Sequence, residues 1–224
     1  MMDFVDYPDV DMLMLQLARQ VSRDLRDALS RRDRVVFAVP GGSTPGPLFD
    51  LLSAVDLEWD RVDVIAGDER WVSEDHPRSN AAQIRTRLMR GHAASARMIS
   101  LWRPLPAPAD AMPEVNAAVE PLLPVDVAIV GMGADMHTAS LFPGADNLAV
   151  ALAEDAPAVV PITAPGVAEP RVTLSARVLK DAYALHVLIT GDAKREAMER
   201  AAKLKPIDAP IAALLGQASV HWAP

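Results

Sequence analysis

The chain has 224 residues, of which half are apolar, and it carries a net charge of −8. It contains no cysteine, which excludes disulfide bonds, zinc–thiolate sites and a thiol nucleophile. Nucleic-acid-binding proteins need a basic surface, so the acidic balance argues against a nucleic-acid partner. For an α/β chain of this length we expect one domain, covering residues 1–224.

The N-terminal segment MMDFVDYPDVDM is acidic and lacks the basic region and apolar run of a secretory signal. No apolar run approaches the length of a membrane-spanning helix. We therefore expect a cytoplasmic protein that makes no contact with a membrane.

Helix-like and strand-like hydrophobic patterns alternate along the first half of the chain. Apolar residues recur every four positions over residues 9–30, which predicts an amphipathic helix. Short apolar runs predict buried strands at Val35–Val39 and Val62–Ala66, and a further strand at residues 99–102. Ser79 and Asn80 are expected to cap a helix that continues to Leu88. The proline-rich residues 104–113 predict an irregular surface segment.

The second half repeats the alternation. Strands or extended segments are predicted at residues 125–130, 159–162, 172–174, 184–190 and 220–222. Among these, the segment with Pro161 and the last one are expected at sheet edges. Helices are predicted at residues 114–120, after a Ser175 cap, after Gly191 and at residues 208–215. Together the elements predict a doubly wound, mostly parallel α/β sheet with helices on both faces.

Polar residues gather where the predicted strands end, and ligands of open α/β sheets bind at the carboxyl ends of the strands. We therefore expect the candidates to share one rim. They are Gly41, Gly42, Ser43, Thr44, Asp68, Arg70, Asp135, His137, Arg171 and Lys194.

The segment from Gly41 to Thr44 joins a predicted strand to a predicted helix. Its backbone N–H groups and hydroxyls can bind an anion at the helix N-terminus. The alternative is an ordinary strand-to-helix loop with a capping residue. The segment is not a P-loop, because no Gly-Lys-Ser/Thr follows, and Pro45 breaks the Gly-x-Ser-x-Gly pattern of a nucleophile elbow.

His137 is the candidate general base, because histidine side chains titrate near neutral pH and Asp135 can orient the ring. The alternative is a solvated loop histidine beside a turn-forming aspartate. Asp68 and Arg70 can equally be a local surface ion pair. Lys194, near a helix N-terminus, suggests an anion nearby, although an exposed lysine on an amphipathic helix fits the same pattern.

No metal or cofactor is expected. The five histidines are scattered and form no ligand pair. The pair Gly131 and Gly133 lacks the third glycine of a dinucleotide-binding fingerprint.

The segment GMGADMHTASLFPG at residues 131–144 resembles the signature of the 6-phosphogluconolactonase family, usually G-[LM]-G-x-D-G-H-T-A-S-L-F-P-G. This is the lactonase branch of the glucosamine/galactosamine-6-phosphate isomerase superfamily. Three further segments match in order, PGGSTP at 40–45, DERWV at 68–72 with Ser79 and Asn80 following, and PRVTLS at 170–175. The resemblance therefore covers most of the chain.

The resemblance implies hydrolysis of 6-phosphoglucono-δ-lactone in the oxidative pentose phosphate pathway. It implies that His137 activates water, that Asp68 orients the water or the base, and that Arg70 stabilises the oxyanion. Ser43, Arg171 and Lys194 would hold the phosphate. We expect a monomer, with a homodimer as the alternative.

Two other functions are compatible with parts of the pattern. Glucosamine-6-phosphate deaminases share the glycine segment and the Asp-x-His pair, but they carry a glutamate where this chain has Phe142. A non-catalytic sugar-phosphate sensor is expected to carry a basic helix-turn-helix segment, and the acidic N-terminal stretch offers none.

Met136 stands where the family has glycine. A positive φ there would cost roughly 1 kcal/mol, whereas an ordinary φ would cost nothing. In either case we expect an active enzyme, with the Met136 side chain directed away from the lactone.

Overall fold

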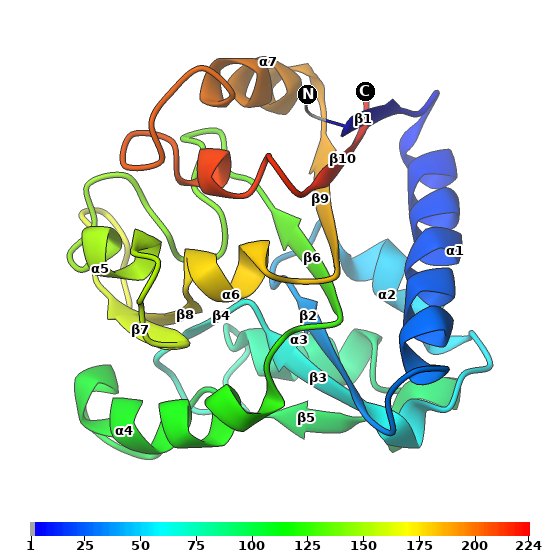
Figure 1. Cartoon of the computed structure of the whole chain (residues 1–224), viewed down its shortest axis with the longest axis horizontal. Coiled ribbons are helices and arrows are strands. Elements are labelled where there is room, and N and C mark those ends of the chain that lie inside the picture. The colour runs from blue at the N-terminus through cyan, green and yellow to red at the C-terminus, as the bar shows by residue number, and fades with distance from the viewer. Residues whose placement is uncertain (1–2) are drawn as a thin grey trace.

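The computed structural model describes residues 3–224 and contains a seven-stranded sheet at its centre (Figure 1). All the pairs in this sheet are parallel. In spatial order its strands are β1 (Asp3–Asp6), β10 (Ser219–Ala223), β9 (Ala184–Thr190), β6 (Val127–Gly131), β2 (Val35–Val39), β3 (Val62–Ala66) and β5 (Arg97–Ile99). The predicted α/β class with a mostly parallel sheet is confirmed.

A second, antiparallel sheet contains β4 (Asp68–Arg70), β8 (Arg171–Leu174) and β7 (Val159–Ile162), in that order. Residues 68–70 follow the predicted strand Val62–Ala66, and they form a separate strand because they pair with β8. Gly67 connects the two sheets, since its N–H donates to Val39 O and its carbonyl accepts from Leu174 N. β7 lies at the edge of this sheet, as Pro161 predicted.

The helices lie on both sides of the large sheet, with α1 and α2 on one side and α6 on the other (Figure 1). The α-helices are α1 (Val10–Leu29), α2 (Gly46–Ser53), α3 (Asn80–Arg87), α4 (Pro108–Val119), α5 (Leu148–Leu152), α6 (Ala176–Lys180) and α7 (Asp192–Ala201). The 3-10 helices are η1 (Trp59–Arg61), η2 (Gly91–Ser95), η3 (Glu120–Leu122) and η4 (Pro210–Ala213).

The N-terminal helix shows why the sequence pattern succeeded there. Asp9 caps α1 by accepting from Met12 N at 2.7 Å. The apolar stripe of the helix is buried against the sheet, at Leu13, Leu17, Val21, Leu25 and Leu29. Strands β2 and β3 are buried along their whole length, which explains their continuous apolar runs.

Three predicted boundaries were wrong, namely the start of α4, the extent of η4 and the end of β5. α4 starts at Pro108, within the stretch expected to be irregular, because proline fits the first turn of a helix. Pro113 lies inside the same helix. Of residues 208–215, only Pro210–Ala213 are helical, and as a 3-10 turn. The strand expected at residues 99–102 ends at Ile99.

Two further expectations failed at the level of single contacts. β10 was expected at a sheet edge, but the short polar strand β1 pairs with it and takes the edge position. Ser175 precedes α6, but its side chain makes no capping hydrogen bond.

A row of polar side chains crosses α1, β9 and β10, and its two histidines, His186 and His221, are buried. His186 contacts Asp24 through Nε2 at 2.9 Å and His221 through Nδ1 at 3.1 Å. The other ring nitrogen of His221 lies 2.9 Å from the Tyr7 hydroxyl. Burial, and then the neighbouring His186, lowers the pKa of His221 from 6.5 to about 4.

Candidate active site

A cavity of about 530 Å³ opens where β2, β3 and β6 end, beside the small sheet and α7. Most of the predicted site residues line it, which agrees with the expectation that they share one rim. These are Gly41, Gly42, Thr44, Asp68, Arg70, His137, Arg171 and Lys194.

Two predicted residues occupy other positions among residues 3–224. Ser43 lines an adjoining cavity together with Asp75 and Gln83. Asp135 contacts the ring of His137 from behind, with its Oδ1 atom 2.5 Å from Nδ1. Asp135 therefore acts on the cavity through His137.

The loop after β6 holds His137 through contacts within the loop. Gly133 N donates to His137 O at 3.0 Å, and Thr138 Oγ1 donates to Gly131 O at 2.9 Å. A Cβ atom at Gly133 would lie 2.3 Å from the His137 ring and 2.5 Å from Asp135 Oδ1. Glycine is therefore required at position 133 because the His137–Asp135 pair occupies that space.

Met136 and Ala139 flank this histidine and both have a positive φ, of 67° and 48°. Met136 thus keeps the conformation that favours glycine, at a cost of about 1 kcal/mol. Its side chain packs against the main hydrophobic core. That packing favours an apolar side chain at position 136.

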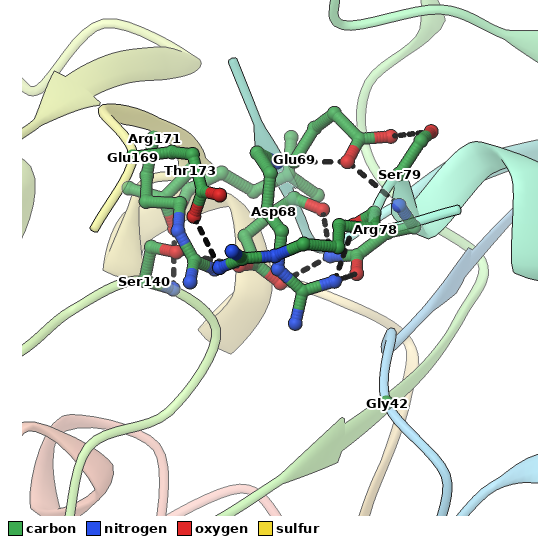
Figure 2. Close-up of polar contacts among 12 residues, drawn as sticks. Gly42, Asp68, Glu69, Arg78, Ser79, Ser140, Glu169, Arg171 and Thr173 are labelled. Carbon is green, nitrogen blue, oxygen red and sulfur yellow. Dashed lines mark hydrogen bonds and ion pairs between the residues drawn. The ribbon is translucent and has the colours of Figure 1, made fainter. Parts of the chain in front are cut away.

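The same loop also reaches Asp68. Ser140 is fully buried, and its hydroxyl donates to Asp68 Oδ2 at 2.5 Å. Arg171 Nη1 lies 3.5 Å from the same oxygen. Figure 2 shows Ser140 and Arg171 converging on Asp68, while the adjacent Glu69 points toward Ser79. Asp68 is only 7% exposed, so its carboxylate is surrounded by donors.

Glu69 anchors the other face of β4 to the start of α3. It accepts hydrogen bonds from the N–H groups of Arg70, Asn80 and Ala81, each at 2.7 Å, and from the Ser79 hydroxyl at 3.0 Å. Burial raises the pKa of Glu69, and these hydrogen bonds oppose that rise. The dipole of α3 also stabilises a negative charge near the N-terminus of the helix, where the Glu69 carboxylate lies.

Unsatisfied donors mark where a ligand would bind. Within residues 3–224, the Nε atoms of Arg70 and Arg171 are buried and have no hydrogen-bond partner. A buried donor without a partner costs about 1–3 kcal/mol. Both arginines line the cavity, so an oxygen-rich ligand there would lie beside their guanidinium groups.

The glycine segment and α7 complete the wall. Gly42 has a φ of 88°, and its N–H donates to Gln83 Oε1 at 3.0 Å. An anion that uses this N–H must therefore displace Gln83. Lys194 lies in the first turn of α7, and burial lowers its pKa. Burial likewise lowers the pKa of Arg171, against the opposing effect of Asp68.

The cavity is cationic although the chain is acidic. Its lining contains Arg70, Arg78, Arg171 and Lys194 but one carboxylate, Asp68, among the described residues. Opposite charge concentrated in a cleft attracts an anionic ligand.

Sequence reasoning missed two parts of this lining. Arg78, whose Nη2 atom lies 2.6 Å from Glu169 Oε2, lies in a segment without a recognisable pattern. Asn80 was expected to be a helix cap, and its side chain instead lines the cavity. Phe142 also lies there, with its ring centroid 4.5 Å from that of His137.

Residues 3–224 contain neither a group of metal-ligating side chains nor a helix that could span a membrane. No three His, Asp or Glu side chains in that range are grouped so as to hold a metal ion. In the same range, no helix combines the length and the apolar character needed to cross a membrane.

Comparisons with known proteins agree with this geometry. The 6-phosphogluconolactonase of Mesorhizobium japonicum is 38% identical over 223 residues, which cover 97% of this chain and 94% of the relative. That of Pseudomonas aeruginosa is 36% identical, over 93% of this chain and 89% of the relative. A 6-phosphogluconolactonase structure from Shewanella baltica has a TM-score of 0.93 at 30% identity, covering 100% of this chain and 98% of that one. Because the family model also matches residues 8–222, the chain belongs to the Glucosamine-6-phosphate isomerases/6-phosphogluconolactonase family.

Proposed function

We propose that the protein hydrolyses 6-phospho-D-glucono-1,5-lactone to 6-phospho-D-gluconate, in the oxidative pentose phosphate pathway. The observation that carries the proposal is His137, oriented by Asp135, in a cavity with four cationic side chains. A phosphorylated lactone needs both a proton acceptor and an anion site. The similarity, over nearly the full length, to two proteins named 6-phosphogluconolactonase supports the same activity.

In the proposed reaction, His137 takes a proton from water through Nε2, because Nδ1 faces Asp135. The water oxygen bonds to the lactone carbonyl carbon and produces a tetrahedral oxyanion. This intermediate collapses by breaking the bond from the carbonyl carbon to the ring oxygen. His137 returns its proton to that oxygen, so the ring opens to a hydroxyl and a carboxylic acid, which ionises.

Arg70 and Asp68 act on the developing charge and on the water in this proposal. Arg70 lines the cavity, so its guanidinium supplies positive charge that stabilises the oxyanion. Asp68 is buried among donors, so its role is to orient water or the base, and not to carry the proton.

For the phosphate we propose Arg171, Lys194 and the glycine segment 41–44. Arg171 and Lys194 line the cavity together with Gly41, Gly42 and Thr44. Charge-assisted hydrogen bonds to phosphate are the strongest contacts that such a site offers. Ser43, in the adjoining cavity, contributes if its hydroxyl turns toward the bound phosphate.

The deaminase alternative is disfavoured by Phe142. Its apolar ring packs against His137 at the position where the deaminases carry a glutamate. An apolar side chain cannot transfer the protons that ring opening and isomerisation require.

We also infer that the protein acts as a monomer in the cytoplasm, with a homodimer as the alternative. Size-exclusion chromatography with light scattering tests the first part. Fractionation of cells that express the chain tests the second.

The test of the function is to generate the lactone in situ from glucose 6-phosphate and its dehydrogenase, and to compare its decay with and without the protein. We expect decay to accelerate in proportion to protein concentration. An unphosphorylated gluconolactone is the matched control, and we expect much slower turnover of it. Equal turnover of both lactones would refute the phosphate site, and unchanged decay would refute the activity.

A further inference from the structure

Asn80, the first residue of α3, contacts both the carboxylate and the guanidinium of β4. It is 2% exposed and its side chain lines the cavity. Its Nδ2 atom donates to Asp68 O at 2.7 Å and lies 3.3 Å from Asp68 Oδ1. Its Oδ1 atom accepts from Arg70 Nη1 at 3.0 Å. One amide therefore connects the two residues.

The orientation of this amide is determined by its partners. An amide carries its donor on nitrogen and its acceptor on oxygen. The opposite orientation would place Oδ1 against the oxygens of Asp68 and Nδ2 against the guanidinium of Arg70. Only the observed orientation satisfies both neighbours. In it, the amide nitrogen faces the oxygens of Asp68 and the amide oxygen faces the guanidinium of Arg70.

The backbone of Asn80 is anchored independently of its side chain. Its N–H donates to Glu69 Oε1 at 2.7 Å, and Ala81 N donates to Glu69 Oε2 at the same distance. These bonds hold the start of α3 against β4 whatever side chain stands at position 80. Substitutions of the side chain therefore test the amide and leave this junction in place.

Gly41 supplies a second, independent observation about the same amide. A Cβ atom at position 41 would lie 2.0 Å from Asn80 Oδ1 and 2.1 Å from Asn80 Cγ. Gly41 is not among the glycines with a positive φ, so its backbone would accept alanine. The space taken by the Asn80 amide is the reason for glycine at this position.

We propose that Asn80 is a positioning residue of the hydrolytic site, and that Gly41 is glycine to make room for its amide. The inference rests on the proposed function and names a further residue of the same site. By fixing Asp68 and Arg70 relative to each other, Asn80 sets where water and the oxyanion lie. Misplacement of such groups by about 1 Å can cost about 100-fold in rate.

The first test compares Asn80→Ala with the isosteric Asn80→Asp in lactone hydrolysis. Asn80→Ala should lower kcat about 10- to 100-fold while KM changes by less than about threefold. Asn80→Asp keeps the acceptor for Arg70 but turns an oxygen toward Asp68. It should be at least as slow as Asn80→Ala. If Asn80 only filled space, the isosteric variant would be the milder one, and that outcome would overturn the inference.

The second test uses position 41. Gly41→Ala should lower kcat to the level of Asn80→Ala, because its Cβ displaces the amide. The double variant Gly41→Ala/Asn80→Ala should be no slower than Asn80→Ala alone, because the Cβ then enters vacated space. Additive losses would contradict the proposal. Gly216→Ala is the matched control, since a Cβ there meets no atom within 4 Å, and it should keep wild-type kcat.

A crystal structure of Gly41→Ala separates this inference from the proposed activity. The Asn80 amide should be rotated away from Asp68 O, with loss of the contact now at 2.7 Å. An amide that stays in place would refute the inference even in an active enzyme. Hydrolysis by the wild-type protein tests the activity itself, whereas the ratios among the variants test the positioning.

Discussion

Asp68 and His137 line the same cavity, but they are held in place in different ways. Asp68 is 7% exposed and contacts side chains from three other segments, Ser140, Arg171 and Asn80. His137 stands on a loop with its side chain 31% exposed, and its ring contacts Asp135 two residues earlier. One side of the site is thus built by the fold, and the other by a short stretch of chain.

Stability and chemistry are therefore coupled on the Asp68 side of the cavity and separable on the His137 side. A buried charge has partners that depend on it, so its removal disturbs the fold. A half-exposed loop side chain has few dependents, so its removal mainly affects the reaction. Substitutions on each side of the cavity test this separation.

Asp68→Ala should lower the free energy of unfolding by about 3 kcal/mol or more. The Arg171 side chain, which is 12% exposed, would then be a mostly buried cation without its carboxylate. Urea unfolding followed by circular dichroism measures this. Ser140→Ala serves as the control, since it removes one hydrogen bond to Asp68 and should cost about 1–2 kcal/mol. Equal stability of Asp68→Ala and wild type would show that the contacts of Asp68 do not stabilise the fold.

Acid should destabilise the protein through His221, which is not one of the residues that line the cavity. Its pKa is lowered to about 4 in the folded state, so between that pH and about 6.5 the unfolded chain binds the proton more readily. Stability is therefore full above about pH 6.5 and falls by about 3 kcal/mol as the pH drops to 4. Unfolding midpoints of wild type and His221→Gln over this range measure it. A variant that loses as much stability as the wild type would contradict this origin.

His137→Ala should impair the reaction and leave the fold almost as stable as in the wild type. We expect turnover to fall about 100-fold or more, because the general base is removed. The free energy of unfolding should change by less than about 1 kcal/mol, because the contact with Asp135 is largely exposed. Steady-state kinetics and urea unfolding on the same preparation check both values. Near-native turnover would assign the base to another residue.

Arg171→Ala and Lys194→Ala should each weaken binding of 6-phosphogluconate by about 1.5–3 kcal/mol, the scale of a charge-assisted hydrogen bond. The two variants should differ in stability, because Arg171 contacts Asp68 whereas Lys194 lies on α7. Arg171→Ala should therefore also lower stability, and Lys194→Ala should not. Calorimetric titration with the product gives the affinities, and unchanged affinity in both variants would exclude this phosphate site.

Met136→Gly should have the smallest effect. The φ of 67° suits glycine, but the methionine side chain packs on the core, so gain and loss offset each other. We expect kcat/KM to change by less than about tenfold, or under about 1.4 kcal/mol. An inactive wild type that this substitution activates would mean that the histidine loop is distorted by methionine.

The same contrast explains what sequence reasoning could reach. The histidine loop was predictable because Asp135, His137 and the residues around them are contiguous, so their spacing is visible in the chain. The glycine segment and the buried strands were predictable for the same reason. Each of these features is local.

The missed features depend on contacts between distant segments. Asn80 looks like a helix cap until β4 lies against α3, and Glu69 looks like a surface charge until four donors surround it. β1 was overlooked because its four residues carry two aspartates and no long apolar run. Its strand conformation comes from pairing with β10, which no local pattern contains.

That pairing has a consequence for the order of folding. Asp3 and Ser219 are partners across 216 positions, so closing this edge of the sheet loses more chain entropy than any pairing between neighbours. Contacts between distant positions form late in folding, after local ones have reduced the freedom of the chain. The edge that begins the amino-acid sequence is therefore expected to be among the last parts of the sheet to form. Until β10 is in place next to β9, β1 has no template on which to form.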